Sequence, residues 1–135
     1  MIVVDSSALV WSLTDDGKLS ERIRSLLSMH TRWIAPAHLA AEFGHAVRGM
    51  CLGGKIEPQK AQLAIGAFLD LGIELVEPDQ TALDRAWQLR QNLSFYDALY
   101  VALAEQTSSP LLTTDARIAA SGTARCEILV ATLDD

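Results

Sequence analysis

The start of this 135-residue chain joins a short strand to a helix through an aspartate. Residues 2–4 (Ile, Val, Val) are β-branched and predict a buried strand, which Asp5 ends. An apolar helical run follows at residues 8–13, and Ser6 and Ser7 are placed to cap it. Because ligands bind at the carboxyl ends of strands in open α/β sheets, Asp5 is a candidate site residue.

The same arrangement recurs near the end of the chain. Residues 111–114 (Leu, Leu, Thr, Thr) predict a short buried strand, Asp115 ends it, and residues 116–120 predict another short helix. Two strands that each end in an aspartate followed by a helix are the first indication of function. They place two carboxylates at one edge of a predicted sheet.

A buried helix comes directly before the second unit. Nearly every residue from 98 to 104 is apolar, which predicts a helix covered on all sides. Ser94 is a good N-cap, and Asp97 follows it at capping-box spacing. Asp97 therefore begins a core helix and is a third candidate acid.

The rest of the chain alternates between strand and helix patterns, separated by Gly and Pro breaks. In one of these helices, residues 81–91, Trp87 is expected to face inward. A proline, Pro36, is expected in the first turn of another. The further predicted strands are residues 32–35, 73–76 and 127–130, and the further helices are residues 20–30, 37–51, 58–71 and 81–91.

This alternation predicts an α/β fold: one domain over residues 1–135, with a central parallel sheet of about five strands and helices on both faces. The chain is half hydrophobic, which suits one sizeable core. No apolar run is long enough to span a bilayer, and Met1 leads directly into a strand. No membrane association is expected, and the cytoplasm is the expected compartment.

The charge balance narrows the functional classes. The chain has 17 acidic and 11 basic residues, for a formal net charge of −6. This argues against a protein that binds nucleic acid through a basic face, but not against a metal-dependent nuclease. The two cysteines, Cys51 and Cys126, have no metal-binding spacing and are expected to be free thiols.

Four acids form the candidate site: Asp5, Glu42, Asp97 and Asp115. Taken singly, each has an ordinary explanation as a helix cap or a solvated helix residue. Taken together, Asp5 and Asp115 project from strand ends, while Glu42 and Asp97 have largely apolar neighbours. Carboxylates gathered in such surroundings repel one another unless a cation or a proton is present. Oxygen ligands suit Mg²⁺ or Mn²⁺, which promote phosphodiester hydrolysis.

These motifs, in order, are DSSALV, a helical glutamate after the second strand, SFYDALYVALA and LLTTDARI. Over essentially the whole chain this order resembles the PIN domain, and more narrowly the VapC-type toxins of bacterial toxin–antitoxin pairs. The resemblance implies that Asp5, Glu42, Asp97 and Asp115 are the catalytic acids that bind Mg²⁺ or Mn²⁺. It also implies a parallel sheet, in agreement with the strand and helix pattern.

The resemblance implies supporting residues, an activity and partners. Ser6 and Thr114 match family positions whose residues often assist the acids. Ser6 would lie beside the metal, and Thr114 comes just before the last acid. The implied activity is metal-dependent endoribonuclease cleavage of structured RNA such as tRNA. The implied partners are the RNA substrate, a second copy of the chain in a homodimer, and a cognate antitoxin that silences the enzyme.

Other side chains have weaker functional interpretations. His38 and His45 flank Glu42 at helical spacing and raise the question of a zinc site, although the spacing is not that of zinc proteases. Arg117 and Arg48 are candidate RNA contacts, and Arg117 is favoured because it follows Asp115 by two positions. Further candidates for phosphate contacts are Lys55, Lys60, Arg85 and Arg90, and the aromatic residues that could stack on bases or pack inside are Trp11, Trp33, Trp87 and Tyr100.

Two other functional classes match the sequence less well or only in part. A phosphatase of the haloacid-dehalogenase type needs an aspartate two residues after the first, where this chain has Ser7. A phosphorelay receiver needs a lysine that closes its last strand, and residues 127–130 offer none. A non-enzymatic module that binds a protein partner, with acids that only cap helices, is the main alternative to a ribonuclease.

Overall fold

The structure, a computed structural model, describes residues 1–133, so the last two residues of the predicted domain lie outside it. Its described strands form one five-stranded sheet in the order β3-β2-β1-β4-β5, and every pairing is parallel. The predicted parallel α/β sheet is confirmed. The strands are β1 (Ile2–Val4), β2 (Trp33–Pro36), β3 (Glu74–Val76), β4 (Leu111–Thr113) and β5 (Ile128–Val130).

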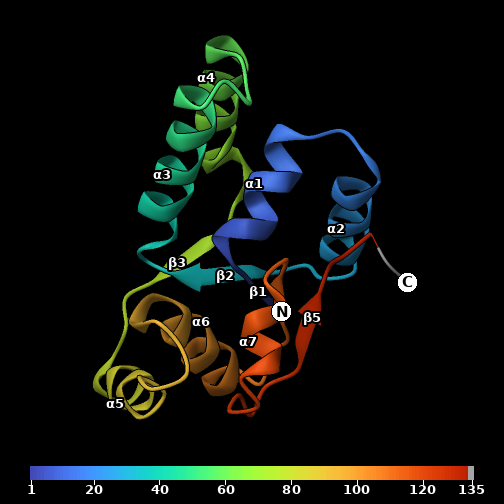
Figure 1. Cartoon of the computed structure of the whole chain (residues 1–135). Coiled ribbons are helices and arrows are strands. Elements are labelled where there is room, and N and C mark those ends of the chain that lie inside the picture. The colour runs from blue at the N-terminus through green and yellow to red at the C-terminus, as the bar shows by residue number, and fades with distance from the viewer. Residues whose placement is uncertain (134–135) are drawn as a thin grey trace.

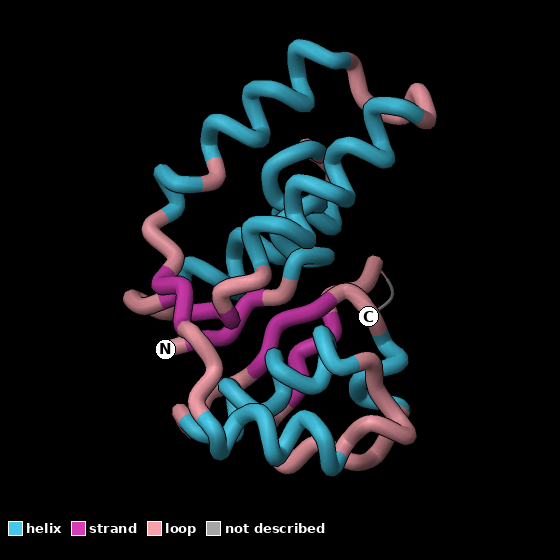
Figure 2. Tube along the Cα trace, turned by 90° about the vertical axis from the view of Figure 1, so that its left-hand side faces the viewer, coloured by secondary structure: helices cyan, strands magenta, loops and turns pink. Residues whose placement is uncertain are grey.

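Helices cover both faces of the sheet (Figure 1). One layer holds α1 to α4, and the other holds α5 to α7; α3 and α4 form a long hairpin that projects from the sheet (Figure 2). No helix in residues 1–133 is long and apolar enough to cross a membrane. The helices are α1 (Ser6–Thr14), α2 (Lys18–Ser28), α3 (Leu39–Leu52), α4 (Pro58–Ala67), α5 (Gln80–Gln88), α6 (Phe95–Gln106) and α7 (Ala116–Ala120), with a 3₁₀ turn at Leu69–Leu71.

The strand order explains how the acids come near one another. Strand β1 lies at the centre, with β2 on one side and β4 on the other. Parallel strands end at the same edge, so the segments that follow β1, β2 and β4 all begin there. Those segments carry Asp5, Glu42 and Asp115.

Helix α6 is the core helix that the sequence predicts. Residues 98–104 are all buried, and the helix packs on α5 and against β1, β2 and β4. Its N-cap is Ser94, whose Oγ accepts a hydrogen bond from the Asp97 amide at 3.1 Å. This cap fixes the first turn of α6, and therefore Asp97, relative to the sheet.

The structure corrects two predicted helix starts. Helix α1 is capped by Asp5 and not by Ser6 or Ser7, because the Asp5 carboxylate accepts a hydrogen bond from the Ala8 amide at 3.1 Å. Pro36 does not open a helix: it is the last residue of β2 and pairs with Val76 of β3. Helix α3 starts three residues later.

The expected inward orientation of Trp87 is wrong. Its side chain lies on the outer face of α5, is 60 % exposed, and is covered in part by the Arg90 guanidinium, 4.7 Å from the ring centroid. Hydrophobic periodicity alone did not distinguish this position from Ala86, which is fully buried.

The predicted helix over residues 58–71 is divided in the structure, because α4 ends at Ala67 and the 3₁₀ turn follows it.

Candidate metal-binding acidic site

Asp5 is the most enclosed of the four acids. It is only 6 % exposed and follows the central strand β1. Its Oδ1 accepts hydrogen bonds from Ser7 Oγ at 2.6 Å and from the Ala8 amide, and its Oδ2 accepts one from Thr113 Oγ1. Burial raises the pKa of Asp5 to about 6, against these hydrogen bonds, and the nearby charge of Asp97 adds to the rise.

Hydroxyl groups tie the ends of β1 and β4 together at this point. Thr113 Oγ1 donates to Asp5 and accepts a hydrogen bond from the Asp115 amide at 2.9 Å. Ser7 Oγ accepts one from the Thr114 amide at 3.0 Å. The backbone that carries Asp115 is therefore held relative to the Asp5 carboxylate across neighbouring strands.

Glu42 lies in the first turn of α3, half-buried, and is held by two ring side chains. Tyr100 donates its hydroxyl proton to Glu42 Oε1 at 2.7 Å, and His38 Nε2 lies 3.3 Å from the same oxygen, without the alignment of a hydrogen bond. Burial raises the pKa of Glu42, but these two contacts outweigh it and lower the pKa overall. Glu42 is thus positioned as a carboxylate.

Asp97 connects the other acids electrostatically. Burial raises its pKa against the Ser94 contact, and the charges of Glu42 and Asp115 raise it further. Asp97 in turn raises the pKa of Asp5. The structure therefore brings Asp97 within electrostatic reach of each of the other three predicted acids.

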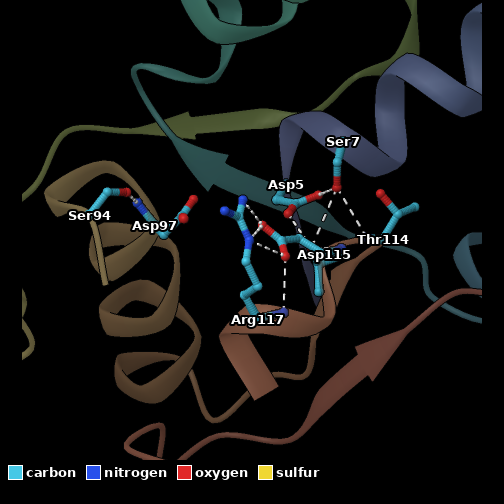
Figure 3. Close-up of polar contacts among 8 residues, drawn as sticks. Asp5, Ser7, Ser94, Asp97, Thr114, Asp115 and Arg117 are labelled. Carbon is cyan, nitrogen blue, oxygen red and sulfur yellow. Dashed lines mark hydrogen bonds and ion pairs between the residues drawn. The ribbon is translucent and has the colours of Figure 1, made fainter. Parts of the chain in front are cut away.

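Asp115 is neutralised by a neighbour. It caps α7 and accepts hydrogen bonds from the Arg117 amide and from the Arg117 guanidinium, at distances from 2.7 to 3.1 Å. The Arg117 side chain is 88 % exposed, and its contact lowers the pKa of Asp115. Figure 3 shows its guanidinium reaching between Asp115 and Asp97. A positive group thus already lies beside the acids.

The donor set of this cluster suits a hard cation. All four side chains offer carboxylate oxygens, the ligands that Mg²⁺ and Mn²⁺ prefer. Within residues 1–133, no three acidic, histidine or cysteine side chains form a ready metal cage. Two of the four carboxylates are engaged with other partners: Asp5 is turned to the hydroxyls of Ser7 and Thr113, and Asp115 is turned to Arg117. A cation would have to draw the carboxylates together and displace the guanidinium.

The remaining predicted residues have varied positions. Ser6 is the first residue of α1 and Thr114 precedes Asp115, both partly buried. Arg48 is exposed on α3, about 9 Å along the helix axis from Glu42. His45 is exposed on the same helix, and the two histidines and Glu42 are not gathered into a group of metal ligands among the described residues.

Several residues that contact the acids were not identified from the sequence. Ser7 and Thr113 are direct neighbours of the predicted Ser6 and Thr114, and only the hydrogen bonds distinguish them. The sequence predicts base stacking or internal packing for Tyr100. Its side chain is buried, and its hydroxyl donates a hydrogen bond to Glu42, which lies 58 positions earlier in the chain. Burial and the Glu42 contact keep the Tyr100 pKa far above its usual range, so it acts as a donor.

Comparisons with known proteins show the family of this chain. Residues 2–122 match the family model described as PIN domain. The ribonuclease VapC1 of Mycobacterium tuberculosis is 40 % identical over 126 residues, which cover 93 % of this chain and 94 % of VapC1.

Solved structures share the fold at low identity. The crystal structure of M. tuberculosis VapC20, described as a toxin that cleaves the sarcin–ricin loop, aligns with a TM-score of 0.67 and 17 % identity over 90 % of this chain and 95 % of that one. The structure of VapBC2 from Rickettsia felis, bound to a DNA fragment from their promoter, aligns with a TM-score of 0.71 and 14 % identity over 98 % and 100 %. The family model and the match to VapC1 show that this chain belongs to the PIN-domain family and, within it, to the VapC ribonucleases.

Proposed function

We propose that this protein is a metal-dependent endoribonuclease and the toxin of a toxin–antitoxin pair. The observation that carries the proposal is the gathering of four carboxylates at one edge of the sheet, where Asp5 is buried and Asp97 interacts with the other three acids. A fold keeps such repelling groups where a cation offsets the repulsion. The family membership agrees with this interpretation.

In this proposal Asp5, Glu42, Asp97 and Asp115 hold Mg²⁺ or Mn²⁺. When bound, such an ion supplies a nucleophile at neutral pH and stabilises the charge that develops on a phosphodiester. The protein contributes the placement of the acids, and Tyr100 keeps Glu42 ionised and oriented through its hydrogen bond.

Groups beside the acids have separate roles. Ser7 and Thr113 orient the Asp5 carboxylate. Ser6 and Thr114 stay in the proposal as supporting residues. Arg117 would leave Asp115 if a cation bound there, and because its side chain is highly exposed it could then contact a substrate phosphate. Arg48, exposed on α3, is a second proposed RNA contact.

The proposed substrate is structured RNA, such as a tRNA. The chain is acidic overall, so long-range attraction to RNA is weak and recognition has to come from local contacts and the cation. A toxin that cleaves the sarcin–ricin loop shares this fold, which makes ribosomal RNA a second class to include in the test.

The proposed partners are a cognate antitoxin and a second copy of the chain. The hairpin of α3 and α4 carries a groove whose lining is largely apolar, and two leucines on the hairpin are exposed. An unpaired apolar surface of this kind marks a protein-binding site. The lining residues are Gly44, Val47, Arg48, Cys51, Leu52, Ala61, Gln62 and Ile65, and the exposed leucines on the hairpin are Leu52 and Leu63.

The proposal is tested by incubating labelled total tRNA and ribosomal RNA with the protein and Mn²⁺ or Mg²⁺. Wild type should give discrete fragments that EDTA abolishes. Asp97→Asn should not, because it removes a charge and keeps the shape. Asp84→Asn, an exposed acid on α5, is the matched control and should cut like wild type. Cleavage by Asp97→Asn at the wild-type rate, with both folds verified by circular dichroism, would refute the proposed site.

A further inference from the structure

One aromatic side chain beside the acids faces solvent. Tyr96 is the second residue of α6 and precedes Asp97, and it is 61 % exposed. The helix is fully buried from residue 98 to residue 104. Tyr96 therefore contributes little to the core, although it lies in the same helical turn as an acid of the candidate site.

The Tyr96 ring lies on the side of α6 that faces Glu42. Its ring centroid is 5.4 Å from that of His38, with the planes tilted by 59°. His38 Nε2 lies 3.3 Å from Glu42 Oε1, and Tyr100, one turn after Tyr96, donates to the same oxygen. Tyr96 and Tyr100 both contact His38, as residues four apart on one helix face can. Tyr96 is the outer, exposed member of this group.

We propose that Tyr96 stacks on an unpaired base of the RNA next to the scissile phosphate, an inference that rests on the proposed ribonuclease function. An exposed ring face beside a phosphodiester site is the element with which proteins hold single-stranded nucleic acid, because every base has a π-face. The acidic net charge makes such a contact more important, since long-range attraction between the protein and RNA is weak. The site then takes loop or single-stranded nucleotides and excludes a continuous duplex, whose bases are already stacked.

The test measures binding of three fluorescent probes: a short single-stranded oligouridine, a duplex RNA of the same length, and a ribose-phosphate chain without bases. Binding is followed by anisotropy with Ca²⁺ as the divalent ion, and gels verify that the probes stay intact. The variants are Tyr96→Ala and Tyr96→Phe. The matched control is Phe95→Ala: Phe95 is 40 % exposed in the same turn but leaves the helix about 100° away.

Tyr96→Ala should bind the oligouridine about 5- to 100-fold more weakly, the usual effect of removing one stacked ring. It should bind the chain without bases as wild type does, whereas Tyr96→Phe and Phe95→Ala should retain wild-type binding of both. An unchanged affinity of Tyr96→Ala, an equal loss on the chain without bases, or no preference of wild type for the single strand over the duplex would overturn the proposal. So would a change in oligomeric state on light scattering, which would assign Tyr96 to a contact between copies.

The cleavage assay keeps this inference separate from the proposed function. If Asp97→Asn cuts RNA as wild type does while Tyr96→Ala loses base-dependent binding, the acidic site is wrong and the stacking contact stands. If Asp97→Asn is inactive and Tyr96→Ala binds all probes normally, the nuclease stands and the stacking contact is refuted.

Discussion

Replacing Asp5 by asparagine should stabilise the metal-free protein while it removes the proposed activity. The carboxylate is buried, so keeping it ionised at neutral pH costs folding free energy. Asparagine has nearly the same shape: its oxygen can accept from Ser7 and the Ala8 amide, and its NH₂ group can donate to Thr113, whose hydroxyl can reverse its role. The change therefore removes the charge and leaves the contacts largely in place.

The size of the effect follows from the pKa of Asp5. Burial raises that pKa from 3.8 to about 6, and at 1.36 kcal/mol per pKa unit the difference corresponds to about 3 kcal/mol. Because the folded pKa is above the unfolded one, the folded state binds the proton more tightly. Wild type should therefore lose stability as the pH rises from about 4 to about 6 and then level off. Asp5→Asn should be more stable by about 2 to 3 kcal/mol at pH 7 and equal to wild type within about 1 kcal/mol at pH 4.

The assay is urea unfolding followed by circular dichroism, in EDTA, at several pH values for both proteins. Subtracting the two pH profiles isolates Asp5 from the other titrating groups. A variant that is less stable than wild type at pH 7, or a difference that does not change between pH 4 and pH 7, would refute the reasoning. Either result would mean that the hydrogen bonds to the carboxylate outweigh its burial.

Three further changes have defined outcomes. Glu105→Gln breaks a partly buried ion pair with Arg85, whose Nε lies 2.7 Å from the carboxylate. It should cost about 1.5 to 3 kcal/mol in urea unfolding, the usual range for a hydrogen bond to a charged group, without altering Mn²⁺ affinity. Tyr100→Phe removes the hydrogen bond to Glu42. Urea unfolding should show a loss of about 1 kcal/mol of stability. Fragment kinetics at saturating metal should show a lower RNA cleavage rate although the variant stays folded. Arg117→Ala removes the guanidinium that competes with a cation, so calorimetry should show tighter Mn²⁺ binding and little change in melting temperature. Unchanged or weaker Mn²⁺ binding by that last variant would contradict the competing role.

Much of the fold could be predicted from the sequence because its signals are local. Three elements could be predicted directly from consecutive residues, and all three are confirmed: the strand before Asp5, the strand before Asp115, and the helix with the apolar run of residues 98–104. The parallel sheet followed from the alternation of elements. Trp87 shows the limit of this reasoning: periodicity could not indicate that α5 turns this face outward.

The contacts inside the candidate site could not be predicted because they join distant segments. Ser7 and Thr113 differ from their neighbours only in side-chain direction, which depends on how β1 pairs with β4. The hydrogen bond from Tyr100 to Glu42 depends on how α6 packs beside α3. Such contacts are set by tertiary packing, so sequence spacing gives no signal for them.

The most direct test of the central claim is to count Mn²⁺ ions bound to the protein by electron paramagnetic resonance. The carboxylate cluster predicts that wild type binds Mn²⁺, that Asp97→Asn loses this binding because Asp97 interacts with all three other acids, and that Asp84→Asn retains it. Equal Mn²⁺ binding by wild type and Asp97→Asn, or none by wild type, would contradict the assignment of these four acids as a metal site.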